Sequence, residues 1–373
     1  MAGREAFFVC RSCKARLSLA EARYKCICGG LLDIGGLDDA FSASSLECDA
    51  HGVFRYRRLM PDIIDGHWHE ATMAEGMTGL VDLNVKGLDM RGKMDYTMPT
   101  LSFKDRGAAV LMAAAKALGI KSVVQDSSGN AGNSIAAYAA RLRIDCEILV
   151  PEGTSPNKIS QIRAYGASVR VVPGSREDTA AAALKEAESG RYYASHVYNP
   201  IFYQGTKTYV YEIWEQLGGK LPEALVVPIG NGTLLLGMLL GLRSLMAGGA
   251  IERMPRIVAV QTARCAPIYR AFMNGERTVT PVTNEGTSAE GIAIAAPVRG
   301  AQMIEALREL GGIVVQAGEE DIARCETMLS KAGIFVEPTS AATVAGAESW
   351  ARAEGFSGSM VLPMCGAGLK SLH

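Results

Sequence analysis

A lysine at the start of a predicted helix is the residue of this sequence best suited to covalent chemistry. Pro99 and Ser102 mark the approach, and residues 107–117 form an alanine-rich, mostly apolar run that predicts a buried helix. Lys104 then lies in the first turn, where its positive charge opposes the helix dipole. This position suits a lysine that must be neutral and nucleophilic. Taken alone, the motif favours the alternative of a solvated lysine at a helix start.

Two glycine-rich turns have the composition of anion-binding sites. Residues 127–132 and residues 229–234 each lie between a short apolar strand and a helix. A strand, a glycine turn and a helix N-terminus together present backbone N–H groups that suit a carboxylate or a phosphate. A lone Gly-x-Gly can also be a simple tight turn, and the serines before Ser134 can cap a helix, which is compatible with anion binding. The predicted strands are 122–124 and 224–228, and the predicted helices are 134–140 and 235–245.

Four cysteines near the N-terminus have a spacing that suggests a metal site. Cys10 and Cys13 form a C-x2-C pair, and Cys26 and Cys28 form a C-x-C pair that is followed by two glycines. Four thiolates paired in this way suit tetrahedral zinc in a small ribbon, although C-x-C departs from the usual C-x2-C. A ribbon without metal and a set of unrelated surface cysteines remain alternatives. The stretch 67–69 (HWH) has no third ligand nearby and is predicted to be a surface turn.

The remaining chain alternates between strands and helices. This order predicts parallel sheets with right-handed crossovers, and hence an α/β fold. The further predicted strands are 145–150, 168–172, 257–261 and 359–362, and the helices between the first of them are 157–165 and 177–189.

Several motifs together resemble one enzyme family. The run 99–107 (PTLSFKDRG), followed by 127–134 (SSGNAGNS), resembles the fold-type II pyridoxal phosphate (PLP) enzymes, and threonine synthases in particular. The similarity continues almost to the C-terminus, in the segments 52–57, 75–80, 198–208, 287–292, 333–342 and 364–370. It is specific for the class and less specific for the substrate. In segment 75–80 Gly79 replaces the proline of the family, which gives that loop more backbone freedom.

The resemblance implies roles for individual residues. Lys104 would form the Schiff base with the PLP aldehyde and, once displaced by the substrate amine, act as the base at Cα. Asn130 would bond the 3-oxygen of the ring, and Cys365 would face the pyridine nitrogen, where a neutral partner favours elimination and replacement at Cβ; a buried core cysteine is the alternative for Cys365. The phosphate would be held by Gly230, Asn231, Gly232, Thr233 and Leu234, and the substrate carboxylate by Ser127, Ser128, Gly129 and Ala131.

The resemblance also implies a division into domains. A zinc-ribbon-like module would span residues 1–34, structural in role and remote from the cofactor. A large PLP-binding domain would combine residues 35–98 and 203–373. A small mobile domain, residues 99–202, would carry Lys104 and the carboxylate loop. Fold-type II enzymes are usually dimers, so a homodimer is expected by analogy.

The sequence departs from threonine synthases where those enzymes grip the phosphate of O-phosphohomoserine. The family has an Asn-Ser pair and an arginine there, and this chain has His196, Val197 and Phe202. Each charge-assisted hydrogen bond lost would remove about 1.5 to 3 kcal/mol, unless Lys207, Arg163 or His196 compensates.

Two enzyme hypotheses and one binding hypothesis follow. The first is a threonine synthase. The second is an enzyme of β-elimination or β-replacement on serine, threonine, phosphoserine or a similar amino acid, such as a dehydratase or a cysteate synthase-like or cysteine synthase-like enzyme. The third, a catalytically silent binding protein, is opposed by the intact Lys104, Asn130 and phosphate turn.

Composition limits the classes of protein to which this chain can belong. The length of 373 residues suggests two domains, and 48% hydrophobic residues with 41 glycines fit a large α/β protein. A net charge of -1 argues against a nucleic-acid partner. We expect no membrane span and no secretion signal, and nine cysteines without a disulfide pattern favour a cytoplasmic protein.

Overall fold

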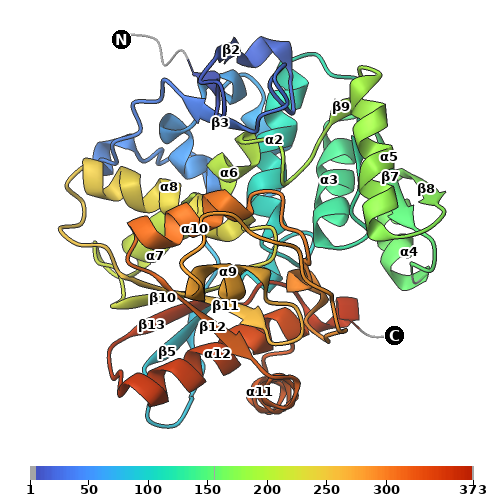
Figure 1. Ribbon diagram of the computed structural model, residues 1–373. Helices are drawn as coiled ribbons and strands as arrows, with labels where there is room; N and C mark the ends of the chain where they lie inside the picture. Colours follow the sequence, from blue (N-terminus) through green and yellow to red (C-terminus); the bar gives the residue numbers. More distant parts are fainter. Residues whose placement is uncertain (1–5, 155, 372–373) are drawn as a thin grey trace. The chain divides into compact units, whose positions relative to one another are not determined.

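The computed structural model describes residues 6–154 and 156–371, without the side chains of 156–158 (Figure 1). These residues pack into two compact units, each made from two stretches of chain. The first unit contains the described residues up to Met77 together with Lys104–Thr208. The second contains Thr78–Phe103 and the described residues from Tyr209 onward. Lys104 is thus the residue at which the chain returns to the first unit.

The first unit begins with a small antiparallel sheet of strand order β2-β1-β3. Cys10 and Leu32, paired across it, are fully buried, and they anchor this sheet at one end. The first five residues of the predicted module 1–34 lie outside the described residues. The strands are β1 (Phe7–Cys10), β2 (Arg16–Ser18) and β3 (Leu32–Gly35), and the short helices that follow are η1 (Leu19–Glu21), η2 (Ala43–Ser45), η3 (Gly52–Leu59), η4 (Asp62–Ile64) and α1 (Trp68–Ala71).

The rest of the first unit is a parallel sheet of order β8-β7-β6-β9 between helices. Side chains on β7 alternate between two cores: Ile148 packs with α3 and α4, and Leu149 packs with α5. Both faces of β7 are therefore covered, as is typical of parallel sheets. The strands are β6 (Ser122–Gln125), β7 (Asp145–Pro151), β8 (Ser168–Val172) and β9 (Tyr192–Tyr193), and the helices are α2 (Lys104–Ala117), α3 (Asn130–Arg141), α4 (Pro156–Ala164), α5 (Arg176–Glu188) and α6 (Ile201–Thr206).

Helices α2 and α6 pack closely because both carry glycine where they meet. A Cβ atom at Gly107 would lie 2.3 Å from the ring of Phe202, and one at Gly205 would lie 1.9 Å from the carbonyl oxygen of Arg106. Side chains larger than hydrogen do not fit at either position. This contact fixes the first turns of α2, which begin at Lys104.

The second unit is built on a sheet of order β12-β11-β10-β13-β5-β4. All neighbouring pairs are parallel except β4 and β5. In Figure 1, α11 and α12 lie on one side of this sheet, and α8, α9 and α10 lie on the other. The strands are β4 (Leu80–Asp82), β5 (Met90–Lys93), β10 (Ala224–Pro228), β11 (Arg256–Thr262), β12 (Ile313–Ala317) and β13 (Met360–Pro363). The helices are η5 (Asp95–Thr97), α7 (Thr208–Gln216), α8 (Thr233–Ala247), α9 (Pro267–Met273), η6 (Glu290–Ile292), α10 (Gly300–Glu309), α11 (Glu319–Lys331), α12 (Pro338–Glu354) and η7 (Gly368–Ser371).

The predicted α/β fold with two parallel-sheet domains is confirmed, with one antiparallel strand at the edge of the larger sheet. The two units divide the chain after Met77, Phe103 and Thr208, and the predicted domains 1–34, 35–98 with 203–373, and 99–202 stay a prediction. A small domain 99–202 that moves as one body stays a prediction. Within the described residues, no helix is both long enough and apolar enough to span a bilayer.

Candidate active site

Lys104 is the first residue of α2 and is half-buried. The helix begins three residues before the apolar run that predicted it, and Asp105 and Arg106 are fully buried despite their charges. The Oγ of Ser134, in the first turns of α3, donates a 2.5 Å hydrogen bond to Oδ1 of Asp105. The beginnings of α2 and α3 are therefore tied together, and Lys104 shares this part of the first unit with the serine loop.

The predicted carboxylate loop lies at the N-terminus of the twelve-residue helix α3. The backbone N–H of Gly129 donates to Ser127 Oγ at 3.3 Å, and the side chain of Asn133 donates to the carbonyl oxygen of Gly129 at 3.1 Å. A Cβ at Gly132 would lie 1.8 Å from the carbonyl oxygen of Ser127, so the loop folds back on the helix. The helix N-cap is Gly129, which has no side chain with which to cap α3.

Ser128, Asn130 and Ala131 complete this loop. Asn130 is the first residue of α3, and Ala131 is buried directly behind it. The helix dipole and the first-turn N–H groups favour an anion at this place. The predicted role in binding a substrate carboxylate fits this geometry and stays a prediction.

Gln125 and His196 support the segment that leads into the serine loop. The sequence analysis did not link these two residues. The Gln125 amide donates to the carbonyl oxygen of Ala194 at 3.2 Å and lies 3.3 Å from His196 Nδ1. The backbone N–H of Asp126 donates to Gln125 Oε1 at 2.6 Å. The His196 ring is buried and meets the Phe202 ring edge-on at 6.1 Å. Burial, together with the positive charges of Lys104 and Arg176, holds the pKa of His196 well below its usual value, so its imidazole is neutral at pH 7.

A buried carboxyl, Glu75, lies behind α3. Its Oε2 accepts from the hydroxyl of Tyr138 at 2.9 Å and from the backbone N–H of Met73 at 2.7 Å. Burial raises the pKa of Glu75 to about 7, and the negative charge of Asp105 adds to the effect. Glu75 therefore belongs to the same buried polar layer as the start of α2.

The second unit carries the predicted phosphate turn between β10 and α8. Gly232 has a φ of 78°, and a Cβ there would lie 2.3 Å from Met303 Sδ, so only glycine fits. A Cβ at Gly230 would lie 2.9 Å from Ile294 and 3.0 Å from the carbonyl oxygen of Gly291. Residues Thr233 and Leu234 form the first turn of α8, a fifteen-residue helix with no side-chain cap bond at its N-cap. Half-buried Asn231 lies between the two glycines.

Cys365 lies at the same edge of this sheet as the phosphate turn. Strands β10 and β13 are parallel neighbours, so their carboxyl ends, which lead to residues 229–234 and to Cys365, emerge together. Cys365 is fully buried; its N–H donates to Ser340 Oγ at 2.8 Å, and its carbonyl oxygen accepts from the N–H of Phe103 at 2.9 Å. The thiol is thus carried on a fixed backbone.

These residues fit PLP. The closed glycine turn at the start of a long helix suits the phosphate, a half-buried lysine in a helix first turn suits the aldehyde, and buried Cys365 lies at the strand edge that carries the phosphate turn. When bound, PLP supplies an electron sink for the substrate carbon linked to it. The structure places Lys104, Asn130 and the serine loop in the first unit, and the phosphate turn and Cys365 in the second.

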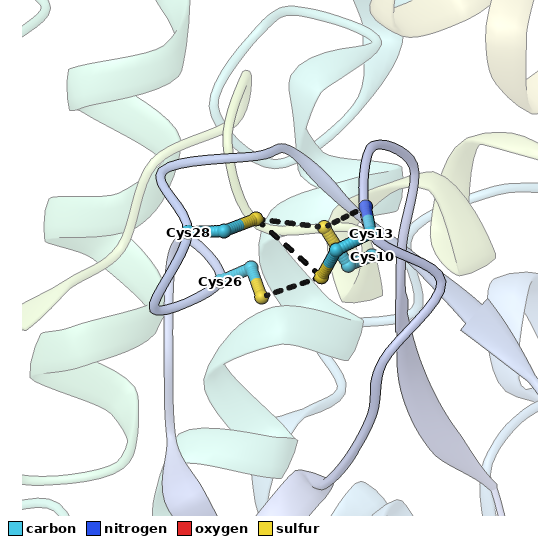
Figure 2. Close-up of side chains that lie close together, drawn as sticks. All are labelled: Cys10, Cys13, Cys26 and Cys28. Atoms are coloured by element: carbon cyan, nitrogen blue, oxygen red, sulfur yellow. Dashed lines mark hydrogen bonds between the residues drawn. The ribbon is translucent and has the colours of Figure 1, made fainter.

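The four predicted metal ligands come together. Figure 2 shows the side chains of Cys10, Cys13, Cys26 and Cys28 converging from two loops of the ribbon. Their sulfur atoms all lie within 4.8 Å of one another, with distances of 3.5 Å between Cys10 and Cys28 and 3.6 Å between Cys13 and Cys26. Four thiolates around one zinc would be about 3.8 Å apart, given a Zn–S bond of about 2.3 Å. The N–H of Cys13 also points to the sulfur of Cys10 at 3.5 Å, and the set fits zinc.

The histidines at 67–69 do not form a metal site with any described residues. Nδ1 of His67 lies 2.9 Å from Glu70 Oε1, and His69 is exposed on the short helix α1. The predicted surface turn is instead the beginning of that helix.

Comparison with known proteins shows the family to which this chain belongs. The family model described as "pyridoxal-phosphate dependent enzyme" matches residues 71–366. A threonine synthase of Methanocaldococcus jannaschii is 32% identical over 350 residues, which cover 90% of this chain and 85% of that protein. The fold is shared with maize serine racemase (TM-score 0.70, 20% identity, 82% of this chain and 93% of that one) and with processed threonine deaminase isoform 2 of Solanum lycopersicum (TM-score 0.69, 22% identity, 88% and 91%). The chain is therefore a threonine synthase-like lyase of the fold-type II PLP-dependent enzyme family.

Proposed function

We propose that this enzyme converts O-phosphohomoserine and water into threonine and phosphate. The observation that carries the proposal is the half-buried Lys104 at the start of α2, in a chain similar over most of its length to threonine synthases. The presence of one anion cradle at α3 and another at α8 supports it, because substrate and cofactor are both anionic.

The residues divide the work as follows. The loop at Ser127, Ser128, Gly129 and Ala131 binds the α-carboxylate and orients the substrate. Lys104 holds the cofactor and then, as a neutral amine, takes the proton from Cα. Neutral His196 adds no second positive charge beside Lys104.

A second reaction is favoured by the surroundings of His196. Val197 and Phe202 are buried, and the described contacts of His196 are with Gln125 and the Phe202 ring. Neutral His196, Val197 and Phe202 carry no positive charge themselves, so a dianionic side chain gains no charge-assisted hydrogen bond from these three side chains. The second candidate is therefore β-elimination or β-replacement on serine, threonine or phosphoserine-type substrates.

One experiment separates the two. Purified enzyme with PLP is assayed for phosphate and threonine from O-phosphohomoserine, and for 2-oxo acid from L-serine and L-threonine, with Lys104→Ala as the inactive control. Threonine formation from O-phosphohomoserine with little 2-oxo acid supports the first reaction. Rapid 2-oxo acid production without threonine refutes it and supports the second.

We further propose a cytoplasmic homodimer with structural zinc in the ribbon. The dimer rests on analogy with the fold-type II enzymes. A solution mass measurement tests it, and a mass equal to one chain would refute it.

A further inference from the structure

An aromatic contact joins the cysteine ribbon to the segment beneath the serine loop. Tyr24, two residues before Cys26, meets the Tyr193 ring edge-on at 5.8 Å and the Tyr198 ring at 5.9 Å. The rings of Tyr193 and Tyr198 lie 5.9 Å from each other. Tyr24, Tyr193 and Tyr198 thus form one set of mutually touching rings, the tyrosine cluster.

The cluster is fixed on two further sides. The ammonium of Lys25 lies 5.0 Å from the centre of the Tyr198 ring and 5.7 Å from that of Tyr24. Tyr193 also packs in the apolar core between the sheet and α5, with Val124 and Leu149. Cation–π contacts and edge-on ring pairs both restrict ring orientation. The ring of Tyr193 is therefore held by the ribbon on one side and by the core on the other.

The hydroxyl of Tyr193 connects this cluster to the serine loop. It donates to Oδ1 of Asp126 at 2.8 Å, while the backbone N–H of Asp126 is held by Gln125 Oε1 at 2.6 Å. Asp126 is thus fixed through both its side chain and its backbone, and Ser127 is the next residue. A change in the tilt of the Tyr193 ring would move the hydroxyl and release one of these two restraints.

From this geometry we propose that Tyr24 is a positioning residue for the loop 127–131. The ribbon then contributes to substrate binding. The Tyr24 ring maintains the hydrogen bond between Tyr193 and Asp126, and this bond keeps the loop in the conformation that binds the carboxylate of an amino acid. The inference rests on the proposed role of that loop, and it assigns no chemical step to the ribbon.

The test compares Tyr24→Leu, Tyr24→Phe and Tyr193→Phe holoenzymes with the wild type. Ile27→Ala is the matched control, because Ile27 is 77% exposed and lies in the same ribbon loop between two of the thiols. L-serine is the probe, and its binding is followed through the absorbance of the bound cofactor. Hydrogen exchange of peptides covering residues 126–134 is measured without substrate.

We expect Tyr24→Leu to weaken L-serine binding about three- to tenfold, the range for loss of one aromatic contact. Hydrogen exchange of the peptides covering 126–134 should be faster. The affinity for PLP and the kcat at saturating L-serine should stay near the wild-type values. Tyr193→Phe should reproduce this pattern, and Tyr24→Phe, which keeps the ring, should behave like Ile27→Ala and the wild type.

Unchanged exchange at 126–134 in Tyr24→Leu would overturn the inference, as would an equal loss of PLP affinity, which marks general destabilisation. If L-serine gave no spectral change even with wild-type enzyme, the second candidate reaction on serine would lose its support, and the exchange measurement would still decide the role of Tyr24.

Discussion

Ser134 and Asp105, which lie in the first turns of the neighbouring helices α3 and α2, are joined by a 2.5 Å hydrogen bond in a buried layer. The bond ties the helix that starts with Lys104 to the helix that carries Asn130. Two residues with separate predicted roles, one covalent and one in ring binding, therefore share one support.

Removal of this hydroxyl should destabilise the protein. In Ser134→Ala the buried Asp105 carboxylate loses a donor, and we expect a fall of about 1.5 to 3 kcal/mol in the free energy of unfolding. Urea unfolding measures it. Ser189→Ala removes an exposed hydroxyl that donates to the carbonyl oxygen of Glu186, and should change stability by less than about 0.5 kcal/mol. Equal effects of the two variants would contradict the structural role of the Ser134–Asp105 bond.

Lys104→Ala should abolish the visible absorption of the lysine-linked cofactor and lower turnover by orders of magnitude, because both the tether and the base at Cα are lost. Lys116 is the matched control in the same helix, since its ammonium only donates to the carbonyl oxygen of Leu142, at 3.0 Å, among the bonds described. Lys116→Ala should keep the absorption. An unchanged spectrum in Lys104→Ala would exclude this lysine as the attachment point.

Gly232→Ala should weaken PLP binding at least tenfold. The substitution adds strain at a φ of 78° and places a Cβ 2.3 Å from Met303 Sδ, so the turn must move away from its helix. Gly249 also has a positive φ, 69°, but nothing lies within 4 Å of its Cβ position. Gly249→Ala is therefore the control that adds backbone strain without a steric clash, and it should leave PLP binding unchanged. If PLP titration gave the same affinity for both variants, the close fit of the turn would not matter for cofactor binding.

The sequence predicted those parts of the fold that depend on local order. β8 and β10 have the predicted bounds, because apolar runs between turn residues mark a strand directly. The predicted starts of α2, α3 and α8 lie a few residues after the observed ones. The first turns of these helices are polar or glycine-rich, and they pack through tertiary contacts that leave no apolar run in the sequence. The two contact units were not predicted for the same reason: the packing of residues 35–77 leaves no local pattern in the sequence.

Site partners far apart in the chain could not be predicted. Gln125 and His196 are 71 residues apart, and Glu75 and Tyr138 are 63 apart, so no periodicity links them. Tyr24 and Tyr193 meet only because the ribbon packs on β9. By contrast, the four cysteines were found from spacing alone, because a metal site in a small ribbon is assembled from short loops.

The buried Glu75 should make stability depend on pH. Its folded-state pKa, about 7, lies above the value of 4.5 expected when exposed, so the folded protein binds the proton more tightly than the unfolded chain. Glu75 therefore costs nothing below about pH 4.5, and it destabilises the fold progressively as pH rises through 7. Between pH 5 and 8 the wild type should lose about 2 to 3 kcal/mol relative to Glu75→Gln, which has no charge to bury. Urea unfolding at both pH values measures the difference. Parallel pH profiles for the two proteins would show that Glu75 is not the group responsible.

Zinc at the four thiols should be required for the ribbon. Burial alone would raise the pKa of Cys10, but N–H groups of Cys13 and Ser12 and the adjacent thiols lower it, while those thiols raise the pKa of Cys13 to about 12. The thiols therefore share their protons, and metal binding would release them. Gly30 allows the loop to pass close to this site, because a Cβ there would lie 2.7 Å from the sulfur of Cys10.

Protein from zinc-supplemented growth should contain about one zinc per chain, and Cys28→Ser should contain almost none and melt at a lower temperature. Cys48 is exposed and lies outside the cluster, so Cys48→Ser should keep the metal. Full zinc in Cys28→Ser would show that Cys28 is not a required ligand. Elemental analysis that found no zinc in the wild type would leave the metal-free ribbon as the correct interpretation. In that case the four sulfur atoms would be held together by the fold of the loops alone.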